Sequence, residues 1–328
     1  MIVLKYPPFR PLGILTNAHS QTVGAFFFGA NSSKHKTVKR VVTLSDGDRI
    51  VIHDDQPKSW IAGDRICVLI HGLGGSHRSP YMQRIANKLY RSGVRTIRVD
   101  MRGFGDSTLL SRGQYSAALS RDVDDVVKLL GVLSPLSKIT LVGFSLGAGT
   151  LLKALGEWSH EHPRSVDSAI AVSPPIDLSY CIANLNKFGN RFYEWFFMNR
   201  LRRKLNYRRR HVKGLIDNGL NPIPRRLVHF DDQFTAPVCG FKSAREYYRV
   251  ASPAPLLNEV SVPTLIVAAK DDPLVPIEMF DKWVMSPEIE FVTTKHGGHL
   301  GFLGRQRVDP DRHWLEWRIS QWVASIDG

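Results

Sequence analysis

Short runs of apolar residues recur along the chain and carry most of its predicted secondary structure. Six of them have strand length, and several are continuous enough to be covered on both faces, as parallel strands are: ICVLIH, VRTIRVD, KITLVGF, SAIAVS, PTLIVAAK and EIEFVTT. Ahead of these, VKRVVTL and RIVIHD flank the turn SDGD, which predicts a β-hairpin. The sheet is therefore expected to begin near residue 38.

Segments with helical spacing of apolar positions lie between the predicted strands. SPYMQRIANKLYRSG (79–93) has a serine cap and a closing glycine, and apolar positions follow helical spacing in YSAALSRDVDDVVKLL (115–130). The repeated alternation predicts an α/β fold with a mostly parallel, doubly wound sheet and helices on both faces. Reactive groups are then expected at the carboxyl ends of the strands.

The alternation divides the chain into three predicted parts. It lapses over residues 174–262, which are mostly helical or irregular in character and are expected to form a helical lid insertion. The α/β core is expected to comprise residues 38–173 and 263–328. Residues 1–37 are expected to be an irregular leader packed on that core.

Composition indicates an ordinary globular protein that acts inside the cell. Hydrophobic residues make up 43% and charged residues 23% of the 328 positions, and the first residues lack the long apolar stretch of a signal peptide or a spanning helix. A cytoplasmic location, with possible membrane association, is the expectation. The three cysteines, Cys67, Cys181 and Cys239, are widely spaced and odd in number, which favours reduced thiols. No metal site and no cofactor are expected.

Much of the formal net charge of +14 comes from one segment of the expected lid. RLRRKLNYRRRHVK (200–213) carries eight Lys or Arg residues and no acid, and an apolar stripe of Tyr193, Phe197, Leu201 and Leu205 runs into it. Such a helix could lie on an anionic membrane surface. The favoured alternative is that the stripe lines an acyl pocket or packs on the core, with the charges on a solvated face.

The stretch GFSLG (143–147) holds the first candidate for chemistry, Ser145. It follows the predicted strand KITLV and opens a helix near Leu146, which is the strand–turn–helix context of a nucleophile elbow. The flanking glycines would remove side chains that clash in so sharp a turn. The alternative is a serine that only caps the following helix.

A nucleophilic serine needs a base and an acid, and candidates for both follow it along the chain. Asp271 and Asp272 come directly after the strand LIVAA, and His296 and His299 lie in a glycine-rich loop after the next strand. The order Ser, Asp, His is that of α/β-hydrolases. We choose Asp272, because the following PLVP can fix its loop, and His299, because its flanking glycines allow the loop to reach the sheet edge. Asp271 is then a turn residue and His296 an exposed loop residue.

The loop IHGLGGS (70–76) can supply the second half of an oxyanion hole. Its glycines leave the backbone accessible, so we assign the hole to the amides of Leu73 and Leu146. His71 is expected to brace this loop as a structural side chain.

With these motifs in place, the chain resembles the α/β-hydrolase superfamily over residues 38–328. A narrower set is similar to the YheT-like hydrolase branch, which is related to lung-type α/β-hydrolase-domain phospholipases and yeast ethanol acyltransferases: NAHSQT, LSDGDRIVIHD, HGLGGS, GFSLGAG, VHFDDQFTAPVCGFKSAREYY, AAKDDPLVP and GGHLGF. The resemblance implies Ser145, Asp272 and His299 as the triad, and ester hydrolysis or acyl transfer as the activity. Asp231 and Asp232 are interpreted as structural anchors of the returning end of the lid.

The sequence thus predicts a serine hydrolase that cleaves carboxylic esters, of acyl or lipid type, through an acyl-enzyme. A small ester is the expected partner, the basic lid could contact an anionic membrane, and nucleic acid is not expected. Two alternatives stay open: acyl transfer to an alcohol by the same triad, and a non-catalytic protein that binds anionic lipid or nucleic acid through its basic segment.

Overall fold

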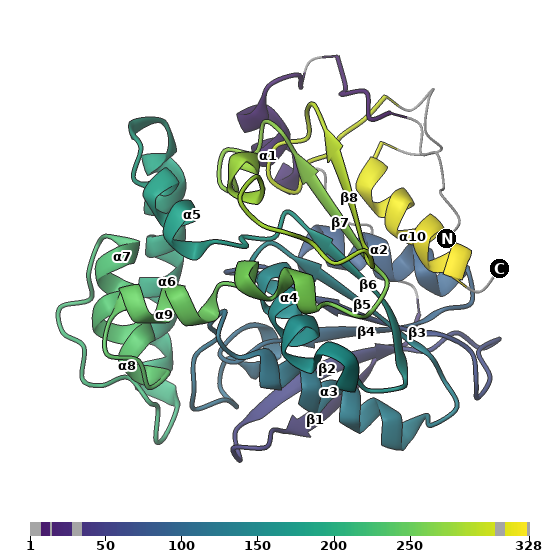
Figure 1. Ribbon diagram of the computed structural model, residues 1–328. Coiled ribbons are helices and arrows are strands. Elements are labelled where there is room, and N and C mark those ends of the chain that lie inside the picture. The colour runs from purple at the N-terminus through teal and green to yellow at the C-terminus, as the bar shows by residue number, and fades with distance from the viewer. Residues whose placement is uncertain (1–7, 14, 28–34, 306–311, 327–328) are drawn as a thin grey trace.

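A computed structural model describes residues 8–13, 15–27, 35–305 and 312–326, with the backbone alone for 25–27 (Figure 1). Within these residues one eight-stranded sheet forms, in the order β1-β2-β4-β3-β5-β6-β7-β8. Its strands are β1 (Val38–Thr43), β2 (Arg49–Asp55), β3 (Ile66–Ile70), β4 (Arg95–Asp100), β5 (Ile139–Phe144), β6 (Val166–Val172), β7 (Thr264–Ala269) and β8 (Ile289–Thr294). Each of the predicted strand runs is found as a strand.

The sheet is parallel from β4 through β8, and the predicted hairpin of β1 and β2 joins it antiparallel to β4. The α/β fold with a mostly parallel sheet is therefore confirmed. The carboxyl ends of β3, β5, β7 and β8 lie along one edge, where loops from distant parts of the sequence meet.

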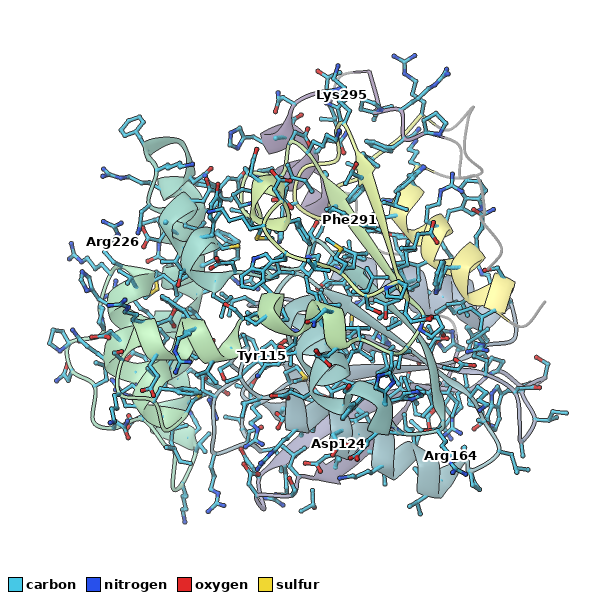
Figure 2. The ribbon with its side chains drawn as sticks, viewed as in Figure 1. Tyr115, Asp124, Arg164, Arg226, Phe291 and Lys295 are labelled. Atoms are coloured by element: carbon cyan, nitrogen blue, oxygen red, sulfur yellow. The ribbon has the colours of Figure 1, made fainter. Side chains whose placement is uncertain are left out.

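Successive residues of the central strands pack on opposite faces of the sheet, as the alternation of strand side chains requires. In β5, Leu141 belongs to the apolar core that includes Val126 of α3 and Leu151 of α4, whereas Val142 belongs to the core with Ile85 of α2 and Ile319 of α10. Helices therefore cover the sheet on both faces (Figure 1), and side chains fill the space between the layers (Figure 2). Every residue of β3 and β5 is buried, so these central strands have no solvated side.

The helices are distributed between the core, the leader and the predicted insertion. In the described residues they are α1 (Ala18–Phe27), α2 (Pro80–Arg91), α3 (Ser120–Leu133), α4 (Leu146–Trp158), α5 (Leu178–Leu185), α6 (Arg191–His211), α7 (Leu227–Phe230), α8 (Ala236–Val238), α9 (Ala244–Ala251) and α10 (Trp314–Ile326). Helices α5 to α9 fall within 174–262 and stand beside the sheet (Figure 1). The domain boundaries, and the role of this insertion as a lid, stay predictions. Over the described residues, no helix combines the length and apolar character needed to cross a membrane.

Three local expectations need correction. The leader is not wholly irregular, because α1 forms there behind Asn17, whose side chain accepts the amide hydrogen of Ser20. The helix expected over 115–130 begins only at Ser120, because the preceding amides of Tyr115 and Ala117 donate to the carbonyl of Arg102 and the hydroxyl of Tyr247.

The third correction concerns the serine cap of α2, because Ser79 accepts the amide hydrogen of Ser76 instead of capping the helix. Of the leader, residues 1–7, 14 and 28–34 lie outside the described residues.

Candidate active site

Ser145 occupies a tight turn between β5 and α4, with a backbone conformation that side-chain-bearing residues rarely adopt. Its φ is 51° and its ψ is −121°, and it lies outside the first turn of α4, which begins at Leu146. Its side chain makes no capping hydrogen bond to that helix. The alternative of a simple helix cap is therefore wrong, and a strained serine at the end of a central strand is the observed geometry.

The two glycines around Ser145 are required by neighbouring backbone. A Cβ on Gly143 would lie 2.6 Å from the carbonyl oxygen of Gly147, and one on Gly147 would lie 2.6 Å from the carbonyl oxygens of Ile70 and His71. Such distances are far inside van der Waals contact. The glycines therefore allow α4 to start directly against the loop after β3, which brings that loop beside the serine.

The structure brings Ser145, His299 and Asp272 into one hydrogen-bonded chain. Nε2 of His299 lies 2.8 Å from Oγ of Ser145, and Nδ1 of His299 lies 2.9 Å from Oδ2 of Asp272. If Nδ1 carries the hydrogen, it donates to the carboxylate, and Nε2 accepts from the hydroxyl. His299 and Asp272 are buried, whereas Ser145 is partly accessible from the cavity described below.

The loops after β7 and β8 select one aspartate and one histidine. Oδ1 of Asp272 accepts the amide hydrogens of Leu274 and Val275 at 2.9 and 3.0 Å, so the following PLV segment fixes the carboxylate while Oδ2 faces His299. Asp271 accepts the amide hydrogen of Gly298, as expected of a turn residue. His296 is partly buried rather than exposed, and its Nδ1 lies 3.5 Å from Asp271.

The leader helix α1 packs against the loop that carries His299. The hydroxyl of Thr22 accepts the amide hydrogen of His299 at 2.8 Å, and Oε1 of Gln21 accepts that of Leu303 at 2.8 Å. A Cβ on Gly298 would lie 2.4 Å from the carbonyl oxygen of Ala18, so only glycine permits this approach. The NAHSQT and GGHLGF motifs therefore contact each other. The sequence alone did not predict that the leader would hold the loop of His299.

Two amide N–H groups beside Ser145 are available to a ligand. Leu146 opens α4, where the first amides of a helix have no partner within the helix. Among the described residues, neither Leu146 nor Leu73 donates its amide hydrogen to a protein acceptor. A Cβ on Gly72 would lie 3.0 Å from the Cβ of Ser145, so the lack of a side chain at Gly72 keeps the approach to the serine open.

His71 has the structural surroundings expected of it. Its Nδ1 contacts the carbonyl oxygen of Gly72 at 2.7 Å, and its Nε2 accepts the amide hydrogen of Met101 at 3.2 Å. Burial lowers the pKa of His71 to about 4, so the ring is neutral and links two loops.

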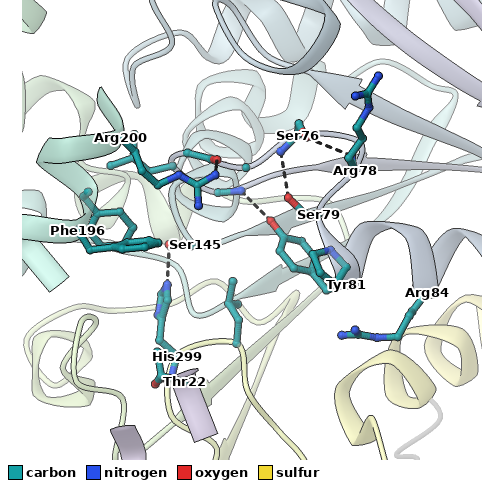
Figure 3. A pocket seen from close by; sticks show the side chains of 17 residues that line it. Thr22, Ser76, Arg78, Ser79, Tyr81, Arg84, Ser145, Phe196, Arg200 and His299 are labelled. Carbon is teal, nitrogen blue, oxygen red and sulfur yellow. Dashed lines mark hydrogen bonds between the residues drawn. The ribbon is translucent and has the colours of Figure 1, made fainter. Parts of the chain in front are cut away.

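A cavity of about 300 Å³ opens over Ser145 (Figure 3). The leader, the loop after β3, α2 and α6 all contribute to its wall; it includes Thr22, Leu73, Tyr81, Phe196, Phe197 and Leu300, with Arg78, Arg84 and Arg200 as its charged members. A smaller cavity of about 80 Å³ borders both Leu73 and Leu146, and is lined mainly by apolar side chains such as Leu178, Ile182 and Phe230. These two cavities meet at Leu73.

The apolar stripe of α6 faces inward, as the favoured alternative held. Tyr193, Leu201 and Leu205 are buried in the core, and Phe197 lines the cavity over Ser145. Further along the helix, the fully buried guanidinium of Arg208 donates to the carbonyl oxygens of Thr108, Ser111 and Gly113 and to the side chain of Gln114. One of the basic residues thus anchors α6 to the core, and only some of them are solvated.

Asp231 and Asp232 anchor the returning end of the insertion, as expected. Asp231 accepts hydrogen bonds from Thr235 and Tyr248 at 2.7 and 2.8 Å, and Asp232 accepts the amide hydrogen of Ala244. Burial raises the pKa of Asp231 to about 6.

One cluster in the described part of the chain, formed by His53, His77 and Asp106, has the spacing of a metal site. Its groups are already engaged: both rings contact Oδ2 of Asp100, at 3.0 and 2.6 Å, and Asp106 pairs with Lys39. Burial opposes the charge on Asp100, but the hydrogen bonds from the two histidines outweigh it and hold the pKa of this carboxyl well below its usual range. The cluster is a satisfied network that joins β2 to the loops after β3 and β4.

Comparison with protein families places these observations in context. The family model described as alpha/beta hydrolase fold matches residues 67–306. YheT of Escherichia coli (strain K12) is 29% identical over 320 residues, covering 97% of this chain and 93% of its own length. The similarity to the YheT-like branch is therefore confirmed.

Other relatives match a shorter part of their own chains. A monoacylglycerol lipase of Saccharomyces cerevisiae is 29% identical over 248 residues, which is 72% of this chain and 54% of the lipase. The human phospholipase ABHD3 is 26% identical over 242 residues, or 72% of this chain and 58% of its own. Among solved structures, the Pyrococcus furiosus esterase Pf2001 covers 98% of both chains with a TM-score of 0.59 at 16% identity, a likeness of fold alone.

Proposed function

Because this chain belongs to the α/β-hydrolase family, we propose that it is a serine hydrolase that cleaves carboxylic esters through Ser145, His299 and Asp272. The names of the relatives, a monoacylglycerol lipase and a phospholipase among them, support an esterase of this kind, with an acyl or lipid ester as substrate. The single observation that carries the proposal is the hydrogen-bonded chain from the strained serine to the buried carboxylate.

In the proposed mechanism, the hydroxyl of Ser145 attacks the ester carbonyl while Nε2 of His299 accepts its proton. Asp272 stabilises the imidazolium through the hydrogen bond at Nδ1. The carbonyl oxygen gains negative charge, which the free amides of Leu73 and Leu146 would bind. His299 then protonates the departing alcohol, leaving an acyl group on Ser145. Water, activated by the same histidine, releases the acid.

Replacement of the nucleophile tests this proposal. Ser145→Ala is expected to lose turnover of short acyl esters and to lose labelling by a fluorophosphonate probe, while its unfolding curve stays that of the unaltered protein. Retained ester turnover would refute the assignment of Ser145. Product analysis in mixtures of water and ethanol would show whether the acyl group passes to water, to the alcohol or to both.

We also propose that the tip of the insertion contacts anionic membrane surfaces. The turn between α5 and α6 projects away from the sheet (Figure 1). In this turn and the first two turns of α6, three aromatic side chains are exposed: Phe188 by 89%, and Phe192 and Trp195 by 60% each. The basic residues Lys187 and Arg191 are their neighbours in the sequence. Exposed aromatic rings next to basic side chains suit the interface of an anionic bilayer. Sedimentation with vesicles should show binding to anionic but not zwitterionic lipid, and Phe188→Ser with Trp195→Ser should abolish it; equal binding to both lipids would contradict the proposal.

A further inference from the structure

The wall of the cavity over Ser145 is positively charged. Three arginines, Arg78, Arg84 and Arg200, reach it from different elements, and the described lining contains no aspartate or glutamate. Arg84 is engaged with Glu316 of α10, and Arg78 lies 3.5 Å from Asp106. Glu316 and Asp106 therefore offset the charges of Arg84 and Arg78, but not that of Arg200.

Arg200 extends from α6 over the cavity (Figure 3). Figure 3 shows Arg200 and His299 approaching Ser145 from opposite sides. The guanidinium of Arg200 donates a hydrogen bond to the carbonyl oxygen of Gly74 across 3.3 Å and lies 5.4 Å from the ring centroid of Phe196. Among the described residues no carboxylate pairs with it. A guanidinium held by one long hydrogen bond and an aromatic ring retains donors for a ligand.

Another basic cavity adjoins the cavity over Ser145 and shares Arg200 with it. This cavity, of about 340 Å³, is lined by Leu73, Gly74, Phe104, Phe197, Leu201, Tyr207 and the cations Arg200, Arg203 and Lys204. Nζ of Lys204 lies 4.1 Å from the ring centroid of Phe104. Burial and the positive charges of Arg208 and Arg200 lower the pKa of Lys204 to about 8, and the negative charge of Asp100 offsets only part of this effect.

We infer that Arg200 binds an anionic group, a phosphate or a carboxylate, on the alcohol part of the substrate, so that the enzyme prefers anionic esters. The inference rests on the proposed ester hydrolysis. A guanidinium forms paired hydrogen bonds with such groups, and a basic cleft with few acids concentrates anions. The small cavity beyond Leu73 and Leu146 is lined mainly by apolar side chains and suits the first carbons of the acyl chain, which leaves the basic cavity for the alcohol part.

The test uses three decanoyl esters that share the acyl chain and a three-carbon alcohol part and differ in the anionic group on that part: decanoylglycerol has none, decanoylglycerol phosphate has a phosphate, and the decanoyl ester of glyceric acid has a carboxylate. All are used below micelle-forming concentrations. For the unaltered protein, kcat/KM for the phosphate or the carboxylate ester should exceed that for decanoylglycerol by about tenfold or more at low salt. The preference should shrink as added salt screens the charge. A preference confined to one of the two anionic esters supports the inference and identifies the group.

Two variants of α6 distinguish recognition of the anionic group from a general effect of positive charge. Arg200→Gln should lower the ratio of kcat/KM for the preferred anionic ester to kcat/KM for decanoylglycerol by about tenfold to a hundredfold. Arg210→Gln removes the same charge from an exposed position of the same helix that lines neither cavity, so it should change none of the three rates by more than about twofold. Arg200→Lys should recover part of the preference.

The possible failures are distinguishable. If the unaltered protein cleaves decanoylglycerol in a Ser145-dependent reaction without preferring either anionic ester, the inference is overturned and the proposed function stands. An equal loss on neutral and anionic esters in Arg200→Gln also overturns it, because Arg200 would then only hold α6 in place. Absence of both ester turnover and fluorophosphonate labelling would overturn the proposed function together with the inference.

Discussion

The hydroxyl of Thr22 joins the leader helix to the loop of His299, and its removal tests whether the leader positions that histidine. It accepts the amide hydrogen of His299 at 2.8 Å and donates to the carbonyl oxygen of Ala18 at 2.7 Å. Thr22 is only 3% exposed, so water has little access to replace these bonds. Thr22→Val keeps the branched shape and removes both hydrogen bonds.

The expected loss of stability in Thr22→Val follows from the amide of His299, which loses its hydrogen-bond acceptor. A buried N–H without an acceptor costs about 1–3 kcal/mol, so Thr22→Val should lower the free energy of unfolding by about that amount. If the same cost appears as displacement of His299 from Ser145, kcat falls about tenfold to a hundredfold. KM should change little, because valine keeps the shape that Thr22 gives to the cavity wall.

The assay combines steady-state kinetics on a neutral short acyl ester with urea unfolding of the same preparations. Thr22→Ser retains the hydroxyl and is the matched control, expected to keep kcat within about threefold. The reasoning would be refuted if Thr22→Val kept the kcat of the unaltered protein, or if Thr22→Ser lost as much as Thr22→Val.

Three further predictions concern packing, anchoring and titration. Gly147→Ala forces a Cβ to 2.6 Å from two carbonyl oxygens and should cost about 3 kcal/mol, whereas Gly131→Ala, with nothing within 4 Å, should gain about 0.5–1 kcal/mol, as urea unfolding would show. Arg208→Met removes four hydrogen bonds between α6 and the core and should cost about 3 kcal/mol and expose α6 to proteolysis. Burial raises the pKa of Asp231 from 3.8 to about 6, so its carboxyl group stays protonated to a higher pH in the folded state than in the unfolded state. The stability relative to Asp231→Asn should therefore fall by about 2 kcal/mol as pH rises from 4 to 7.

Each of these predictions has a result that would contradict it. Equal effects of the two glycine substitutions would mean that crowding at the serine turn is relieved by small shifts. Unchanged protease resistance in Arg208→Met would show that apolar contacts alone hold α6. A stability difference between Asp231→Asn and the unaltered protein that is constant with pH would mean that the buried carboxyl does not change its charge in this range.

The sequence by itself determined the sheet, the serine turn and the order of the candidate residues. Apolar runs such as KITLVGF report local periodicity and burial, so the strands were predictable without knowledge of their neighbours. The glycines around Ser145 encode a turn whose requirements are local, and they predicted the conformation found there. The placement of Asp272 and His299 after consecutive strands β7 and β8 was predictable because the carboxyl ends of parallel strands share one edge.

Only the tertiary structure decided which side chains meet at that edge and what surrounds them. Thr22 and His299 are separated by 277 residues, and Arg200 and Gly74 by 126, so no local pattern could pair them. From the sequence, the apolar stripe of α6 could face a membrane or, as we favoured, a pocket or the core. The burial of Leu201, Leu205 and Arg208 in the structure fixed the orientation of the helix. Such contacts depend on how helices and loops from distant parts of the chain pack together. The free energy gained by burying a side chain depends on how closely the surface that covers it fits, and a local sequence pattern does not specify that surface.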